Sequence, residues 1–188
     1  MNFMNKRKIV AVIGLPGSGK TEAINYLIKK LAWPKIYLGD ATFEELKKRG
    51  LAVSEKNERI IRESLRKKHG MACYALWAIK KIKESKNTQN ILIESLYSWD
   101  EYLEFKKVFG DNFLVVAIYS SPKERYRRLA KRKIRPLTIE EARSRDYSQI
   151  ANLAQAGPIA MADWTIVNND LRQNLFLQLN KIIQKIKK

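Results

Sequence analysis

Residues 14–21 have the types and the spacing of a phosphate-binding loop. They read Gly-Leu-Pro-Gly-Ser-Gly-Lys-Thr and fit the pattern G-x-x-x-x-G-K-[ST], directly after the apolar run 9–13 and before a helix-forming stretch. Glycines adopt backbone angles that are closed to other residues, so successive N–H groups can surround a phosphate while the next helix adds its positive N-terminal end. The loop predicts a nucleotide-binding site, with ATP and Mg²⁺ as the cofactors.

The side chains of this loop have distinct predicted roles. Lys20 would reach the β- and γ-phosphates of the nucleotide, and Thr21 would give its hydroxyl to magnesium. The predicted nucleotide-binding residues of the loop are Gly14, Pro16, Gly17, Ser18, Gly19, Lys20 and Thr21.

Two carboxylates lie where strands are predicted to end, at the sheet edge that holds ligands in doubly wound folds. Asp40 follows the segment 35–38, and we predict that it orients or deprotonates an acceptor hydroxyl. The alternative is a turn or helix cap. Glu94 ends the segment 90–94 and is predicted to hold a magnesium-bound water or an acceptor group. The alternative role of Glu94 is a structural hydrogen bond to a neighbouring loop.

A short arginine-rich segment lies between two predicted helices. The first helix begins at residues 120–122, where a capping serine precedes proline, and the second begins at Thr138 with Glu141 as its capping box. We predict that about 128–140 forms a lid whose cations surround the moving phosphoryl group and whose closure excludes water. The alternative is that each arginine only forms part of a solvated helix surface. The predicted catalytic cations of the lid are Arg128, Arg132 and Arg135.

Short apolar, β-branched segments alternate with helical patterns along the chain, which is typical of a parallel sheet wrapped by helices. A charged, helix-favouring insertion of about 42–86 follows the second segment and is predicted to bind the acceptor. A last helix over 171–186 would pack one apolar face on the sheet. The predicted strands cover residues 8–13, 35–38, 90–94, 113–119 and 164–167.

Length and composition narrow the class of protein. A chain of 188 residues with 45% apolar content suits a single domain over 1–188. The sequence contains neither an apolar run near the ~20 residues that cross a bilayer nor a secretion signal, so we expect no membrane partner and a cytoplasmic location. One cysteine and one histidine leave oxygen ligands for a metal. A monomer or a homodimer is expected.

The net charge of +18 would attract polyanions and leaves a nucleic-acid surface open as an alternative. The charges are spread along the chain, and the sequence shows neither an RNA-binding aromatic signature nor a zinc finger. A phosphorylated small molecule fits the charge equally well, and we favour it as the partner.

The rest of the chain separates the classes that use this loop. A guanine-specific GTPase needs an Asn-Lys-x-Asp signature, whereas the nearest candidate, 168–170, lacks the lysine and the spacing. A motor ATPase has Asp-Glu after four apolar residues, whereas the third predicted strand ends in Glu94 and a serine. Small size, a helical insertion and an arginine-rich lid favour a small-molecule kinase.

The order of several short motifs resembles a largely archaeal group of P-loop kinases that is similar to dephospho-coenzyme A kinase and adenylate kinase. The likeness extends over nearly the whole chain. It rests on the segments 14–20, 38–40, 66–70, 118–129, 144–146 and 162–168.

This resemblance implies a three-layer α/β P-loop NTPase fold: a parallel five-stranded sheet flanked by helices, with a helical acceptor-binding insertion and a short lid. It places Asp40 near the acceptor and the loop around Asn168 at the adenine pocket. Two segments differ from the relatives, whose lids carry paired aspartates where this chain has 134–137 and whose third strand ends in Asp-Gly and an arginine where this chain has 94–96.

The sequence thus predicts an ATP-dependent phosphotransferase whose acceptor is a nucleotide or a nucleotide-like small molecule. The alternative is a P-loop ATPase with a regulatory or nucleic-acid-linked role.

Overall fold

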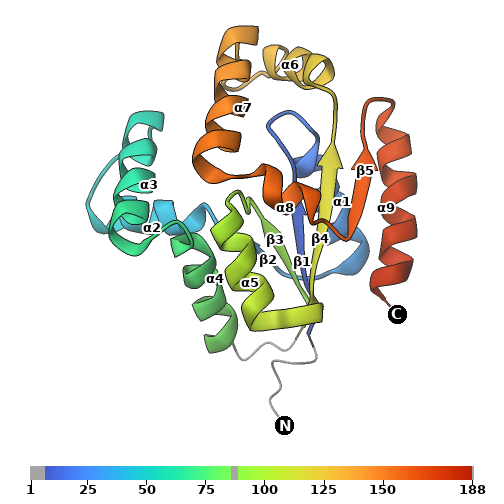
Figure 1. Cartoon of the computed structure of the whole chain (residues 1–188), viewed down its shortest axis with the longest axis horizontal. Coiled ribbons are helices and arrows are strands. Elements are labelled where there is room, and N and C mark those ends of the chain that lie inside the picture. Colours follow the sequence, from blue (N-terminus) through green and yellow to red (C-terminus); the bar gives the residue numbers. More distant parts are fainter. Residues whose placement is uncertain (1–6, 86–88, 188) are drawn as a thin grey trace.

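A parallel five-stranded sheet forms the centre of the computed structural model, which describes residues 7–85 and 89–187 (Figure 1). The strands lie side by side in the order β2-β3-β1-β4-β5, and each pairing is parallel. Their carboxyl ends therefore meet at one edge of the sheet. The strands are β1 (Ile9–Ile13), β2 (Lys35–Tyr37), β3 (Ile91–Glu94), β4 (Phe113–Tyr119) and β5 (Trp164–Val167).

Helices cover both faces of this sheet, which confirms the predicted α/β fold class. Helices α4 and α5 pack on one face, and α1 and α9 pack on the other. The helices are α1 (Lys20–Leu31), α2 (Asp40–Lys48), α3 (Glu55–His69), α4 (Cys73–Glu84), α5 (Trp99–Phe109), α6 (Pro122–Ala130), α7 (Ile139–Leu153), α8 (Ala156–Ala160) and α9 (Arg172–Ile186), and a 3₁₀ turn, η2, spans Gly110–Asn112.

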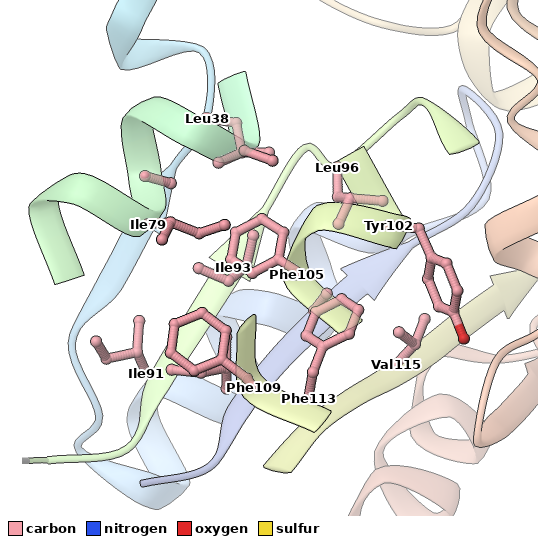
Figure 2. Packing of buried hydrophobic residues seen from close by; sticks show 14 of the residues in the cluster. Leu38, Ile79, Ile91, Ile93, Leu96, Tyr102, Phe105, Phe109, Phe113 and Val115 are labelled. Atoms are coloured by element: carbon pink, nitrogen blue, oxygen red, sulfur yellow. The ribbon is translucent and has the colours of Figure 1, made fainter. Parts of the chain in front are cut away.

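The central strand β1 is buried along its whole length because both of its faces meet helices. Ile9 and Ile13 lie in the cluster that contains the stacked rings of Phe105 and Phe113, whose centroids are 5.1 Å apart (Figure 2). Val10 lies in the other cluster, with α1 and α9. Burial on both faces explains why the strand reads as a continuous apolar run instead of an alternating one.

Local capping signals in the sequence match the observed helix starts. Ser121 caps α6 with Pro122 as the first helical residue, and Thr138 forms a capping box with Glu141 at the start of α7. Predicted strand ends differ from the observed ends by at most one residue. The helical insertion begins at α2, two residues before the predicted position 42, and its predicted end at residue 86 lies outside the described residues.

The segment 131–138 joins α6 to α7 without a helix or a strand and covers most of the predicted lid. In Figure 1 both of these helices lie beyond the carboxyl ends of the strands, at the top of the view. Within the described ranges, none of the helices is long and apolar enough to span a bilayer.

Candidate functional site

The phosphate-binding loop connects β1 to α1, and two of its glycines are required by conformation and by space. Gly17 has φ 80° and Gly19 has φ 104°, angles that side-chain-bearing residues rarely adopt. A Cβ atom at Gly17 would lie 2.7 Å from the carbonyl oxygen of Arg125, and one at Gly19 would collide with the side-chain amide of Asn168. The surrounding residues therefore touch the loop backbone directly.

Buried side chains hold the carbonyl groups of this loop. The Arg125 guanidinium donates to the Pro16 oxygen at 3.1 Å, and the Gln155 amide donates to the Gly14 oxygen at 3.1 Å. Asn168 Nδ2 donates to the carbonyl oxygen of Ser18 at 2.8 Å. These donors occupy the loop carbonyls, so the loop is fixed in shape before any ligand binds.

A cavity of about 360 Å³ lies beside the loop and brings together several of the predicted residues. Lys20, Thr21, Glu94 and Arg132 all line it. The cations of the lining outnumber the single carboxylate among the described residues, which favours an anionic ligand such as a triphosphate. The charged residues that line the cavity are Lys20, Lys35, Glu94, Arg132 and Arg145.

Lys20 is buried beside three arginines, and both features oppose its positive charge. The pKa of Lys20 is lowered from 10.5 to about 7, mainly by burial and then by the positive charges of Arg132, Arg145 and Arg125, while Glu94 acts in the opposite direction. Phosphate oxygens in the cavity would favour the charged ammonium and raise this pKa again.

Binding of Mg-ATP is therefore expected to take up protons. At about pH 8 Lys20 is mostly neutral in the free protein, and the phosphates would recharge it, so uptake approaches one proton per ATP. At about pH 6 Lys20 is already charged and the uptake disappears. Affinity for ATP should consequently fall as the pH rises above 7. Calorimetric titration in buffers of different ionisation enthalpy measures this uptake, and equal uptake in Lys20→Ala would contradict the assignment.

Thr21 and Glu94 line the same cavity, as a magnesium ion at the phosphates would require. Glu94 is engaged by Lys35, whose ammonium lies 2.5 Å from the carboxylate. Across the part of the chain that the structure describes, His, Cys, Asp and Glu side chains do not gather in groups of three or more that could hold a metal. Magnesium would thus depend on phosphate oxygens, with Thr21 as a direct ligand and Glu94 acting through water.

A second cavity, of about 1170 Å³, adjoins the first between the helical insertion and α7. The two cavities share part of their lining, and this junction is where an acceptor would meet the γ-phosphate. Gln149 Oε1 is buried there without a hydrogen-bond partner among the described residues. The residues that line both cavities are Tyr37, Ser95, Tyr97, Arg145 and Gln149.

Ser95 has a strained backbone at this junction. Its φ of 69° lies in the left-handed region, and its Oγ accepts a hydrogen bond from the Tyr97 hydroxyl at 3.0 Å. Glycine would adopt this angle without strain. We conclude that the serine is retained at a cost in backbone energy.

Replacing Ser95 with glycine is expected to stabilise the protein, because relief of an αL strain of about 1 kcal/mol or more exceeds the net contribution of one partly buried hydrogen bond. The melting temperature should rise by roughly 2–4 °C. Ser95→Ala is the matched control, since it also removes the hydroxyl but keeps the strain, and it should not raise the melting temperature. A decrease in Ser95→Gly would refute this interpretation.

The arginines of the predicted lid do not act as one group in the structure. Arg132 lines the smaller cavity, and Arg135 lines the larger one. Arg128 lines neither, so its catalytic role stays a prediction. Its guanidinium donates instead to Ser120 Oγ at 3.3 Å and to the carbonyl oxygen of Asn168 at 2.8 Å, because the last turn of α6 faces the ends of β4 and β5.

Two other predicted residues lie outside both cavity linings. Asp40 is the exposed first residue of α2, directly after the N-cap Gly39, and its predicted role toward an acceptor stays a prediction. Asn168 is buried, and its side-chain amide already donates to the phosphate-binding loop. The geometry shows that Asn168 supports this loop, and its predicted contact with adenine stays a prediction.

Sequence reasoning missed the arginine that fixes the lid helices. Arg125 forms two hydrogen bonds to the Asp146 carboxylate, at 2.8 and 2.6 Å, and both side chains are at most 5% exposed. This pair joins α6 to α7, and the same guanidinium also reaches Pro16 in the loop. The Ser-Arg-Asp motif at 144–146 was the available signal, since it holds this aspartate next to Arg145.

Comparisons with known proteins agree with this geometry. The family model AAA_18, described as an AAA domain, matches residues 10–149. A UPF0200 protein of Thermococcus kodakarensis is 33% identical over 95% of this chain and 97% of its own length.

Among solved structures, shikimate kinase from Bacteroides thetaiotaomicron has a TM-score of 0.60 at 16% identity, covering 96% of this chain and 99% of its own. A gluconokinase from Sinorhizobium meliloti has a TM-score of 0.53 at 13% identity, with 97% of each chain covered. At these identities the likeness shows the fold of P-loop kinases.

Proposed function

The chain belongs to the UPF0200 family and to the AAA_18 family of AAA domains, and from that premise we propose that it transfers the γ-phosphoryl group of ATP to a nucleotide or nucleotide-like small molecule. One observation carries the proposal: a cationic cavity beside the phosphate-binding loop opens into a larger cavity through a shared junction. A reaction that joins a triphosphate to a second ligand needs this arrangement.

The residues of the junction match the needs of phosphoryl transfer. The bond from the γ-phosphorus to ADP breaks as the bond to the acceptor oxygen forms, and catalysis depends mainly on position and on cations around the three equatorial oxygens. Lys20, Arg132 and Arg145 line the smaller cavity from α1, the α6–α7 connection and α7, and they would surround these oxygens. Magnesium, when bound, would neutralise charge on the β- and γ-phosphates. Movement of the segment 131–138 as a lid would exclude water.

The preference for a nucleotide-like acceptor rests on the resemblance to adenylate kinase and dephospho-coenzyme A kinase and on the aromatic lining of the larger cavity. Tyr37 and Phe43 line it and offer faces on which a planar base could stack. Shikimate and gluconate, the substrates named for the two structural neighbours, are acceptor candidates to be tested beside nucleotides.

The test is transfer of label from γ-labelled Mg-ATP to a panel of nucleoside monophosphates, dephospho-coenzyme A, shikimate and gluconate. Labelled product with one class of acceptor is the expected result. Absence of transfer to every compound, with ATP still bound, would contradict the proposal.

Replacing Arg145 with glutamine is expected to reduce transfer by about a hundredfold or more, because it removes a cation at the junction from the transferring phosphoryl group. Arg143→Gln is the matched control, since Arg143 lies on the same helix and lines neither cavity, and it should keep its activity. Equal rates in the two variants would exclude Arg145 from the reaction.

The net charge of +18 favours one alternative, a regulatory ATPase that binds nucleic acid. That function predicts strong, salt-sensitive binding of RNA or DNA that changes the rate of ATP hydrolysis. Binding without any change in ATP turnover would reflect surface charge alone.

A further inference from the structure

The larger cavity differs in charge from the molecule as a whole. Basic residues outnumber acidic ones 37 to 19 in the chain, yet the described lining of this cavity has five arginines, no lysine and more glutamates than arginines. Such a lining does not attract a polyanion as the outer surface does. The cavity therefore suits a ligand of low net charge. Its glutamates are Glu55, Glu58, Glu63, Glu101, Glu140 and Glu141.

Carboxylates already engage several of these arginines. Arg62 forms ion pairs with Glu55 at 3.0 Å and with Glu58 at 3.3 Å, along α3. Arg135, from the segment between α6 and α7, reaches the same two glutamates at 3.4 and 3.3 Å. A ligand would have to displace a carboxylate to use either guanidinium, which makes both poor sites for a further anion.

Arg66 is different because the described residues provide it with no ion pair and no hydrogen bond. Its Nε is buried without a partner, and its guanidinium lies 5.2 Å from the centre of the Tyr74 ring. The hydroxyl of Tyr74 is held in turn by Thr42 at 2.8 Å, so the ring is fixed in place. A buried donor without an acceptor is costly, and a ligand oxygen would relieve that cost.

The carboxyl group that Arg66 influences electrostatically is Glu101, which forms the capping box of α5. Burial raises the pKa of Glu101 to about 7, against the effect of hydrogen bonds from Tyr97 and Ser98 and of Arg66 itself. Glu101 is therefore partly protonated near neutral pH and offers less than a full counter-charge. An anion next to Arg66 would meet correspondingly little repulsion.

We propose that Arg66 binds a single compact anionic group of the acceptor, either a phosphate monoester or a carboxylate. This inference rests on the proposed phosphotransferase function and adds the chemical class of the acceptor. The planar guanidinium can donate two parallel hydrogen bonds to such a group, and the Tyr74 ring fixes the plane from which it donates. The paired arginines and the glutamates around it disfavour an acceptor with several phosphates in a row.

The test uses small probes, so the acceptor need not be known. The protein is saturated with Mg²⁺ and the non-hydrolysable analogue AMP-PNP, which fills the phosphate-binding loop, and inorganic phosphate or acetate is then titrated by calorimetry. The variants are Arg66→Gln, Arg66→Lys, which keeps the charge, and Arg59→Gln. Arg59 is the matched control because it lies on the same helix and lines the same cavity but is exposed, 3.9 Å from Glu63.

We expect saturable binding of one anion by the wild-type protein, weakened about tenfold or more in Arg66→Gln and by less than about threefold in Arg59→Gln. Arg66→Lys should retain part of the affinity, which would exclude misfolding as the cause of the loss. The tighter of the two anions identifies the group as a phosphate or a carboxylate.

Three results would overturn the inference: no saturable binding of either anion, equal losses in Arg66→Gln and Arg59→Gln, or Arg66-dependent binding of an oligonucleotide more tightly than of phosphate. Failure of the phosphotransferase proposal is recognised separately, because AMP-PNP binding and label transfer are measured without the probe anions.

Discussion

Lys20→Ala is expected to reduce phosphoryl transfer by at least about a hundredfold, the scale of losing one preorganised donor to developing charge. The ammonium lies in the cavity beside the loop, where its one hydrogen bond to a described residue is to the carbonyl oxygen of Leu15 at 3.0 Å. Labelled ATP and the acceptor found in the panel measure the loss.

We expect the loss of activity in Lys20→Ala to occur without a loss of stability. The pKa of Lys20 is lowered to about 7 because burial and neighbouring arginines oppose its charge, so removal of the ammonium relieves repulsion. The melting temperature should therefore stay the same or rise. Lys30→Ala, at an exposed position in the last turn of α1, is the matched control and should keep full transfer. A parallel loss of stability and activity in Lys20→Ala would mean that the lysine is structural.

Local sequence signals account for most of the fold. The phosphate-binding loop, the proline and serine at the start of α6, and the Thr138 capping box act over a few residues, so their geometry follows from neighbours in the chain. The five apolar segments that alternate with helical patterns predict the parallel sheet. Their order in space, β2-β3-β1-β4-β5, depends on contacts between distant segments, and no pattern within one segment carries it.

Three arginines in α6 and in the connection after it differ in the structure in a way that their sequence pattern does not predict. Arg125, Arg128 and Arg132 follow one another at helical spacing and look alike in the sequence. In the structure the first is buried against Asp146, the second holds the ends of two strands, and the third lines the nucleotide cavity. Their different surroundings come from the segments that pack against each position, which only the packed fold determines.

The junction between the cavities was not predictable for the same reason. Tyr37 ends β2, Tyr97 precedes α5, and Arg145 and Gln149 lie one turn apart on α7. None of these residues belongs to a recognisable motif with the others, since more than 100 positions separate the first from the last. Only the carboxyl-end edge of the sheet brings them together.

Arg125→Ala is expected to cost about 3–5 kcal/mol of folding free energy, the range for removing one partner of a buried ion pair. The Asp146 carboxylate would stay buried with the Tyr126 hydroxyl as its remaining partner at 2.9 Å, and the carbonyl oxygens of Pro16 and Ser120 would each lose a donor. With about 2–4 °C per kcal/mol for a chain of this size, the melting temperature should fall by roughly 10 °C. Thermal unfolding by circular dichroism measures it.

Two further variants test whether the loss of stability comes from the buried Arg125–Asp146 pair or from a change in charge alone. Arg127→Ala, next to Glu124 on the exposed side of α6, should change stability by less than about 1 kcal/mol. The double variant Arg125→Met, Asp146→Leu should be more stable than Arg125→Ala, because it leaves no unpaired charge in the interior. If it is not, the hydrogen bond from Arg125 to Pro16 carries the stability. ATP affinity would then fall together with the melting temperature, because the phosphate-binding loop depends on α6 for its shape.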